Sequence, residues 1–255
     1  MRPPRTIVSL VPSLTEALFS LGLGERVVGV TEWCIHPASG VAPLPKLGGT
    51  KNPDLQAIRE LAPDLVIANR EENRKGDVAK LRDWGYEVWV TYPTTVREGA
   101  ELLRELAGLG APEERARAVV DPVFEALEEA EDRSPGHRPR VFCPIWKDPW
   151  MSVGHDTYAQ NLIELCGGSN VFSDLPDRRY PRVTEEEILA AAPEVILLPD
   201  EPYRFSESDA AALGSWPIPA AREGRIHCID GTLVSWYGPR IRRAIEVLQN
   251  LLCRA

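Results

Sequence analysis

The sequence lacks the features that mark several classes of protein. It has no run of about 18 uncharged apolar residues, which a membrane-spanning helix requires. The net charge is −9, from 29 basic and 38 acidic residues, and the basic residues form no patch. A nucleic-acid-binding protein usually shows a basic excess or a basic patch, so that class is not indicated. The apolar content of 44% excludes wholesale disorder.

Cysteine is scarce and irregularly spaced. The five residues are Cys34, Cys143, Cys166, Cys228 and Cys253. Their odd number, their wide spacing and the lack of a Cys-x-x-Cys pair indicate neither a disulfide framework nor a zinc knuckle. Cys143 and Cys228 lie inside apolar runs, so we expect both to pack as small buried side chains.

The familiar catalytic motifs are absent as well. The chain contains no Gly-x-Ser-x-Gly and no His-Glu-x-x-His. Gly22-Leu-Gly24 follows a predicted helix and lacks the third glycine of a dinucleotide-binding loop, and Gly48-Gly-Thr-Lys51 is too short for a phosphate-binding loop. The motifs therefore give no catalytic residue.

The first residues do not form a convincing signal peptide. Met1-Arg-Pro-Pro-Arg5 is followed by an apolar stretch that reaches Glu16 without a small-residue cleavage site. If the sequence is complete, we expect a cytoplasmic protein. If a signal was trimmed, we expect a periplasmic or cell-surface protein.

The length of 255 residues fits one large domain or two domains of roughly 100–130 residues. Strand-like apolar runs alternate with helical patterns, which is typical of parallel βαβ units. The predicted strands are 6–10, 26–30, 64–68, 87–92, 140–145, 194–198 and 225–229. The predicted helices are 13–21, 54–61, 73–84, 95–109, 112–133, 156–165, 184–192 and 239–252. We expect Ser13 and Glu16 to form a capping box and Asp54 to cap the second helix.

Two observations favour a two-lobe organisation. The helix predicted over 112–133 has about 22 residues and would span roughly 33 Å, enough for a strut between lobes. An ordinary surface helix on one sheet is the alternative. In addition, 61–69 resembles 191–199, and the two aligned prolines, Pro63 and Pro193, are 130 residues apart. We predict an α/β protein with an N-terminal lobe (1–111), an inter-lobe helix (112–134) and a C-terminal lobe (135–255).

Aromatic residues gather in loops, most of which follow predicted strands. They are Trp33, Trp146, Trp150, Tyr180, Tyr203, Phe205, Trp236 and Tyr237. The carboxyl ends of parallel strands meet at one edge of a sheet, so we expect these rings to lie on one rim. Large rigid rings with a polar tip suit a flat, partly apolar ligand, and core packing is the alternative for each ring.

A polar cluster, 69–73, directly follows one buried strand. Arg70 can donate paired hydrogen bonds, and Glu71, Glu72 and Asn73 can accept them from amide or hydroxyl groups of a ligand. A solvated charged loop is the alternative. Asp200-Glu-Pro-Tyr203 follows the matching strand of the second half, so an enzyme that uses Glu71 or Glu72 with Asp200 or Glu201 is a further alternative. Cys34 and His36 are candidates for a metal pair, with structural roles as the alternative.

Several segments together resemble a known family. They are Val8-Ser-Leu-Val-Pro-Ser-Leu-Thr-Glu16, Val28-Gly-Val30, Pro63-Asp-Leu-Val-Ile67, Gly167-Gly-Ser-Asn170 and Gly238-Pro-Arg240. In this order they resemble the helical backbone metal receptor (TroA-like) superfamily, the class III substrate-binding proteins of ABC importers, and the cobalamin branch is the nearest match. The resemblance covers essentially the whole chain. It implies two Rossmann-like α/β lobes with central parallel sheets, joined by one long backbone helix, with the ligand in a cleft between the lobes.

The resemblance also implies which residues contact the ligand. With Glu71 and Glu72 of the polar cluster, the predicted ligand-binding set is Pro12, Ser13, Leu14, Trp33, Asn69, Arg70, Glu71, Glu72, Trp146, Trp150, Tyr180, Trp236 and Tyr237, within loops that include 146–150 and 233–237. Asn69 stands where cobalamin-importer proteins tend to have Trp.

We therefore expect non-catalytic binding of a corrinoid such as cobalamin, or of a related metal-bearing macrocycle, with no catalytic cofactor. A ferric siderophore or haem binder, with Tyr180 or His36 as the iron ligand, is an alternative. The family docks on the membrane subunits of its importer through one Glu per lobe, and the matching positions here are Lys75 and Ser235. Glu72 or Asp77 can substitute nearby. The expected partners are the small ligand and an importer subunit, or the ligand alone in a cytoplasmic corrinoid-handling relative.

Overall fold

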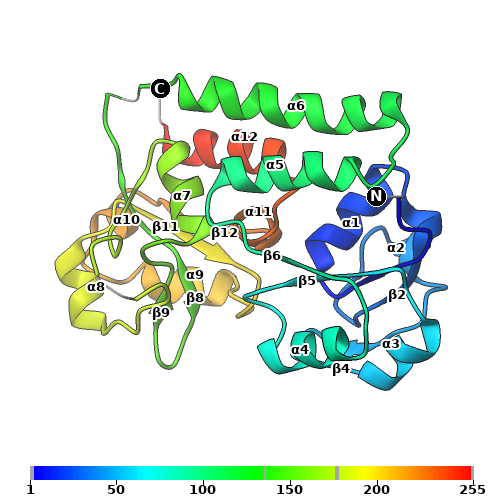
Figure 1. Ribbon diagram of the computed structural model, residues 1–255. Helices are drawn as coiled ribbons and strands as arrows, with labels where there is room; N and C mark the ends of the chain where they lie inside the picture. Colours follow the sequence, from blue (N-terminus) through cyan, green and yellow to red (C-terminus); the bar gives the residue numbers. More distant parts are fainter. Residues whose placement is uncertain (1–2, 135, 176–177, 254–255) are drawn as a thin grey trace. The chain divides into compact units, whose positions relative to one another are not determined.

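The computed structural model describes residues 3–134, 136–175 and 178–253. The chain divides into two compact units (Figure 1). Unit 1 comprises Met1–Pro93, Glu98–Phe124 and Tyr237–Pro239. Unit 2 comprises Thr94–Arg97, Glu125–Trp236 and Arg240–Ala255. The three-part division into 1–111, 112–134 and 135–255 stays a prediction.

Unit 1 is built on a parallel four-stranded sheet in the order β2-β1-β5-β6. Its strands are β1 (Ile7–Ser9), β2 (Val27–Val30), β5 (Leu65–Asn69) and β6 (Val88–Thr91). The other elements are α1 (Pro12–Ser20), η1 (Gly24–Arg26), α2 (Ala38–Val41), the hairpin β3 (Gly48–Gly49) and β4 (Asn52–Pro53), α3 (Leu55–Leu61), α4 (Lys75–Asp83) and most of α5 (Val96–Ala107). Ile58 of α3 and Leu81 of α4 pack with Val66 of β5 in one apolar core.

Unit 2 repeats this plan with a parallel sheet in the order β10-β7-β11-β12. Its strands are β7 (Arg140–Phe142), β10 (Ser169–Asn170), β11 (Val195–Pro199) and β12 (Ile226–Ile229). The other elements are the hairpin β8 (Pro144–Trp146) and β9 (Met151–Ser152), α7 (Tyr158–Leu165), α8 (Glu185–Ala191), α9 (Glu207–Leu213), α10 (Pro219–Arg222), α11 (Thr232–Ser235) and α12 (Ile241–Leu252). The predicted α/β architecture with two parallel sheets is therefore confirmed.

The long helix predicted before the second half is α6, which runs from Glu113 to Glu131 without interruption at Pro122. Its residues up to Phe124 belong to unit 1, and those from Glu125 belong to unit 2. Its acidic first turn, Glu113 and Glu114, suits the positive end of the helix dipole.

The repeat seen in the sequence is also present in the structure. Asp64, just before β5, accepts hydrogen bonds through its carboxylate from the backbone N–H groups of Arg5 (2.7 Å) and Thr6 (3.1 Å), which precede β1. Glu194, just before β11, accepts one from the N–H of Arg140 (2.9 Å), where β7 begins. The acid in each half thus fixes the first strand of its own sheet.

Two local predictions are wrong. Ser13 does not cap α1: the helix begins at Pro12 and its N-cap is Val11, which makes no side-chain cap. The fixed φ of proline favours the first helical position, so the N-cap is Val11, two residues before the predicted cap at Ser13. Cys228 is exposed because β12 is the last strand in its sheet, whereas Cys143 is buried as expected. The predicted N-cap of α3 is confirmed, since Asp54 accepts from Gln56 and Ala57.

No helix within the described parts of the chain is both long and apolar enough to cross a lipid bilayer.

Candidate functional site

The loop after β2 presents the most exposed large apolar side chains of unit 1. Trp33 is 65% exposed and Ile35 is 56% exposed. Between them Cys34 points inward, with its Sγ 3.2 Å from the hydroxyl oxygens of both Thr15 and Thr31. Burial raises the pKa of the Cys34 thiol, so it stays neutral at physiological pH. The loop is therefore anchored by one buried thiol and offers two apolar side chains to solvent.

The β3–β4 hairpin supports this loop. The N–H of Glu32 donates to the carbonyl of Gly48 (2.9 Å). A Cβ atom added at Gly49 would lie 3.7 Å from Nε1 of Trp33, so the indole lies against the hairpin backbone. The Lys46 ammonium donates to the carbonyl of Cys34 (3.2 Å) and fixes the far side of the loop.

The 69–73 turn follows β5 at the same carboxyl edge of the sheet. Oδ1 of Asn73 accepts from the N–H of Asn69 (2.7 Å), and its Nδ2 donates to the carbonyl of Thr50 in the hairpin (2.9 Å). The Lys51 ammonium donates to the carbonyl of Glu71. The turn, the hairpin and the Trp33 loop thus form one hydrogen-bonded surface.

Three further predicted residues of unit 1 begin α1, at the carboxyl end of β1. Pro12, Ser13 and Leu14 are all buried. Arg70 is exposed instead, and its guanidinium lies 4.6 Å from the centroid of the Tyr92 ring. The carboxyl edge of this sheet therefore combines an exposed cation with exposed apolar groups.

In unit 2 the β8–β9 hairpin presents Trp146, which is 44% exposed and meets the Tyr203 ring edge-on at 5.6 Å. Trp150 is only 8% exposed and stacks on Phe205, with 6.0 Å between ring centroids and 6° between planes. Trp150 also meets Phe142 edge-on in the core. Trp146 can offer its ring to a ligand, whereas Trp150 holds the hairpin on the core.

An ion pair fixes the same hairpin. Nζ of Lys147 lies 2.7 Å from Oδ1 of Asp209, which is largely buried at the start of α9. The Lys147 hydrogen bond is the main cause of a lowered pKa at Asp209, and Asp209 raises the pKa of Lys147 in return. Both groups are charged at neutral pH.

Tyr180 lies in a loop that runs beside β9. The carbonyl of Pro181 accepts from the N–H of Ser152 (3.0 Å), and the carbonyl of Arg179 accepts from the N–H of Gly154 (2.8 Å). A Cβ atom at Gly154 would lie 2.4 Å from a backbone oxygen of this loop, so only glycine permits the approach. Tyr180 is 41% exposed and lies in this loop, which is hydrogen-bonded to the β8–β9 hairpin.

The loops after β11 and β12 are bonded to one another. Oδ1 of Asp200 accepts from the N–H of Gly231, and Oε1 of Glu201 accepts from the hydroxyl of Ser235, both at 2.7 Å. Trp236 is 7% exposed and lies under the Arg240 guanidinium at 4.7 Å. Asp200 and Glu201, two of the four carboxylates considered for an enzyme, therefore serve as acceptors that shape these loops.

The predicted set divides by exposure into three groups, with Glu71 and Glu72 half-buried between the exposed and the buried residues. Trp33, Arg70, Trp146 and Tyr180 are exposed, whereas Asn69, Trp150, Trp236 and Tyr237 are buried. Ligand contact by each of them stays a prediction. Ile35 was not among the candidates identified from the sequence. Its position in the loop after β2, two residues from Trp33, could have indicated it.

The structure does not complete a metal site around Cys34 and His36. The described residues contain no group of three or more His, Cys, Asp or Glu side chains placed to hold a metal ion. A metal-binding cysteine acts as a thiolate, and the buried Cys34 thiol is held neutral. Metal binding by His36 stays a prediction.

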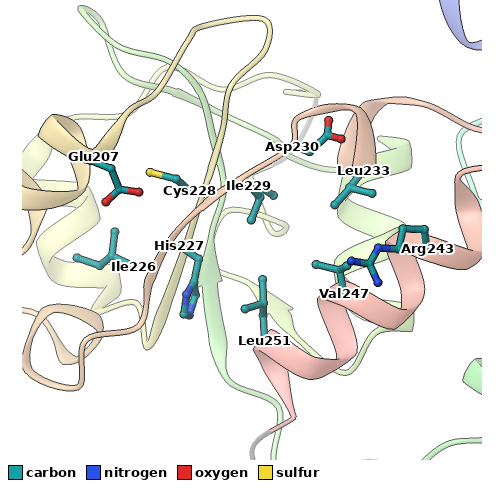
Figure 2. A pocket seen from close by; sticks show the side chains of 10 residues that line it. All are labelled: Glu207, Ile226, His227, Cys228, Ile229, Asp230, Leu233, Arg243, Val247 and Leu251. Atoms are coloured by element: carbon teal, nitrogen blue, oxygen red, sulfur yellow. The ribbon is translucent and has the colours of Figure 1, made fainter. Parts of the chain in front are cut away.

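A cavity of about 470 Å³ lies elsewhere in unit 2, along the open edge of β12 (Figure 2). Arg243, Val247 and Leu251 project into it from α12, and Glu207 and Cys228 border its opposite side. A second cavity, of about 510 Å³, is lined by residues of α5, α6 and α7. Of the residues and loops predicted to bind ligand, these cavities include one residue, Leu233 of the 233–237 loop.

Comparison with known proteins agrees with this fold. The vitamin B12-binding protein of Vibrio cholerae serotype O1 is 28% identical over 251 residues, which cover 96% of this chain and 87% of that protein. The apo structure of the periplasmic heme-binding protein RhuT from Roseiflexus is 28% identical with a TM-score of 0.80, covering 97% of each chain. The periplasmic vitamin B12-binding protein BtuF of Vibrio cholerae has a TM-score of 0.82 at 23% identity, covering 98% of this chain and 96% of that one, and this likeness shows the fold alone.

The sequence-based resemblance to importer substrate-binding proteins is confirmed at the level of the family. The model of the periplasmic binding protein family matches residues 7–230, which include both parallel sheets. This chain therefore belongs to the periplasmic binding protein family.

Proposed function

We propose that this chain is a substrate-binding protein that holds a corrinoid, cobalamin or a close relative, without changing it chemically. The observation that carries the proposal is the exposure of aromatic rings on the carboxyl-end loops of each unit: Trp33 in unit 1, and Trp146 and Tyr180 in unit 2. A corrin ring is flat and broad, with apolar edges and polar side groups, and indole and phenol rings suit such a surface. The similarity to a vitamin B12-binding protein over 96% of the chain supports this choice.

The polar side groups of a corrinoid are mostly amides, which both donate and accept hydrogen bonds. The exposed Arg70 offers donors to amide oxygens, and its neighbours Glu71 and Glu72 offer acceptors to amide N–H groups. The turn that carries them is held by Asn69 and Asn73, so these polar groups are presented by an ordered backbone.

Titration of the purified protein with cyanocobalamin, followed by absorbance and calorimetry, tests the proposal directly. We expect saturable binding with one ligand per chain. No binding at about 100 μM, which corresponds to less than about 5.5 kcal/mol of binding free energy, would reject it. Mass spectrometry of the released ligand should show the unaltered compound, because the family binds solutes and the proposal includes no reaction.

Haem is the second candidate, because Tyr180 offers an exposed phenol that can ligate iron and a heme-binding protein is 28% identical to this chain. Titration with haem would then give a Soret band that shifts on binding, and Tyr180→Phe would change that band. Competition between haem and cyanocobalamin in one experiment decides which ligand is preferred.

We further propose that the chain acts outside the cytoplasmic membrane and delivers its ligand to the membrane subunits of an ABC importer. The family description supports this location. At the predicted docking position Ser235 donates to Glu201, so a carboxylate lies beside the serine. Glu201→Lys should lower ligand uptake by cells that express the importer and leave the Kd unchanged. Glu129→Lys, at an exposed position of α6 in unit 2, is the matched control. Immunodetection in fractionated cells of the source organism tests the location.

A further inference from the structure

Tyr237 and Asn69 are joined by a hydrogen bond between segments 168 residues apart. Nδ2 of Asn69 donates to Oη of Tyr237 at 2.7 Å, and both side chains are buried, with 2% and 7% exposure. Tyr237 was predicted to contact ligand, yet it lies in the short segment Tyr237–Pro239 of unit 1, whose chain neighbours Trp236 and Arg240 belong to unit 2.

The amide of Asn69 is fully used. Its Oδ1 accepts from the backbone N–H groups of Glu71 (2.8 Å) and Glu72 (3.3 Å), which fixes the oxygen toward the turn. The NH₂ group has two hydrogens. One is directed at Thr91, where the carbonyl (3.1 Å) and Oγ1 (3.3 Å) lie close together, and the other is directed at Tyr237. The tyrosine hydroxyl therefore fixes the direction of the same amide that shapes the turn.

The position of Tyr237 is itself constrained by the residue that follows it. Gly238 has a φ of +104°, a conformation that strains any residue with a Cβ atom. A Cβ atom there would also lie 3.5 Å from Cβ of Ala17 in α1, so the segment lies close against that helix. The ring of Tyr237 is thus held from the side of α1, and its hydroxyl reaches the end of β5.

We propose that Tyr237 is a positioning residue, whose hydroxyl, acting through Asn69, holds the 69–73 turn in the conformation that presents Arg70 and Glu71. Its role is not direct contact with the ligand. The effect of Tyr237 on ligand affinity rests on the proposed ligand-binding function. Its effect on the conformation of the 69–73 turn is a property of the ligand-free protein. Tyr237 and the 69–73 turn, both of unit 1, were predicted as separate ligand contacts and are then coupled through one hydrogen bond.

The first experiment uses the ligand-free protein. Tyr237→Phe removes the acceptor and keeps the ring, and we expect amide hydrogen exchange at Glu71 and Glu72 to become roughly 2- to 10-fold faster, as loss of one hydrogen bond implies. Tyr86→Phe is the matched control, because the Tyr86 hydroxyl donates to the carbonyl of Arg59 in the same unit and lies outside the predicted site. Unchanged exchange at the turn in Tyr237→Phe, or an equal change in Tyr86→Phe, would overturn the proposal.

The second experiment measures the Kd for cyanocobalamin in Tyr237→Phe, Asn69→Ala and the double variant. We expect each single variant to bind several-fold more weakly and the double variant to be no worse than Asn69→Ala, because Tyr237 acts only through Asn69. Additive losses in the double variant would assign Tyr237 a direct ligand contact and contradict its positioning role. If the unmodified protein binds no cobalamin, the proposed function fails, and the exchange experiment still decides whether Tyr237 holds the turn.

Discussion

Ala62 and Ala192 end two seven-residue helices, α3 and α8, in the same left-handed backbone conformation, with φ of 44° and 45°. Each alanine is followed by proline, an acid and a fully buried strand. The two residues are 130 positions apart in the sequence, so the internal repeat extends to an unusual backbone angle. A non-glycine residue in this region costs about 1–2 kcal/mol.

Relief of this strain should stabilise each unit. We expect Ala62→Gly and Ala192→Gly each to raise the free energy of unfolding by up to about 1 kcal/mol, because glycine adopts positive φ without a steric penalty. The greater freedom of glycine in the unfolded chain offsets part of this gain. Ala79→Gly, in the exposed interior of α4, is the control of opposite sign and should destabilise by about 1 kcal/mol. Urea titration followed by circular dichroism measures all three, and a loss of stability in both of the first two variants would contradict the strain argument.

The aromatic residues of unit 2 should separate into binding and packing roles. Trp146→Ala, at an exposed ring, should weaken cobalamin binding by about 1–3 kcal/mol with a small effect on stability. Trp150→Ala removes a ring that is 8% exposed and stacked on Phe205, so it should lower the free energy of unfolding by about 3–5 kcal/mol. Calorimetric titration and thermal unfolding distinguish the two, and a Trp146→Ala protein with unchanged Kd would remove that ring from the site.

The Lys147–Asp209 pair should make stability depend on pH at both ends of the range. The pKa of Asp209 is lowered from 3.8 in the folded protein. The Asp209 carboxylate therefore adds to the free energy of unfolding above the pKa of the unfolded state, and this contribution is lost as the pH falls through the pKa of the folded state. The pKa of Lys147 is raised from 10.5 in the folded protein. The Lys147 ammonium therefore adds to the free energy of unfolding below the pKa of the unfolded state, and this contribution is lost as the pH rises through the pKa of the folded state.

Asp209→Asn should therefore lower the free energy of unfolding by about 1–3 kcal/mol at pH 7, and the difference from the unmodified protein should shrink below about pH 4. Lys147→Met removes the donor that lowers the pKa of Asp209, so the loss of stability in acid should begin at a higher pH. Denaturant titrations between pH 2 and pH 7 measure both effects. Parallel curves for Asp209→Asn and the unmodified protein throughout this range would contradict the assignment.

The thiols should differ in reactivity according to their burial. Burial raises the pKa of Cys143 and of Cys166 to about 12, so both remain unreactive thiols at pH 8 in the folded protein. Cys228 is exposed on the edge strand β12 and should react early with a thiol reagent, more slowly than a free cysteine because its pKa is also raised. Labelling followed by peptide mass spectrometry in native and denaturing buffer tests this order, with Cys228→Ser as the control. Early labelling of Cys143 in native buffer would contradict it.

Much of the fold could be predicted because it depends on local patterns. The apolar runs at 64–68 and 194–198 predicted β5 and β11 within one residue, since continuous apolar runs mark strands buried on both faces. Asp54 predicted the start of α3 because an N-cap acts through atoms two and three residues away. The short helices α2, α10 and α11 were missed because each has four residues, little more than one turn of about 3.6 residues, so no apolar position repeats within it.

The candidate site was predicted only in outline. The loops that follow strands were identified correctly as the places for aromatic and polar side chains, because the carboxyl ends of parallel strands share one edge. Which rings face solvent could not be predicted. Trp146 and Trp150 lie four residues apart in one hairpin, yet one is exposed and the other is covered. Trp150 is covered by Phe142, at the end of β7, and by Phe205, which comes from the distant loop after β11.

The sequence by itself determined the alternation of strands and helices, the internal repeat and the family, because each depends on the order of residues along the chain. Only the tertiary structure decided that Asn69 and Tyr237, both expected at the ligand, are buried and bonded to each other. The physical reason is that a hydrogen bond across 168 residues leaves no trace in local composition or spacing. A buried amide must satisfy its donors and acceptors with whatever groups the folded chain brings within reach.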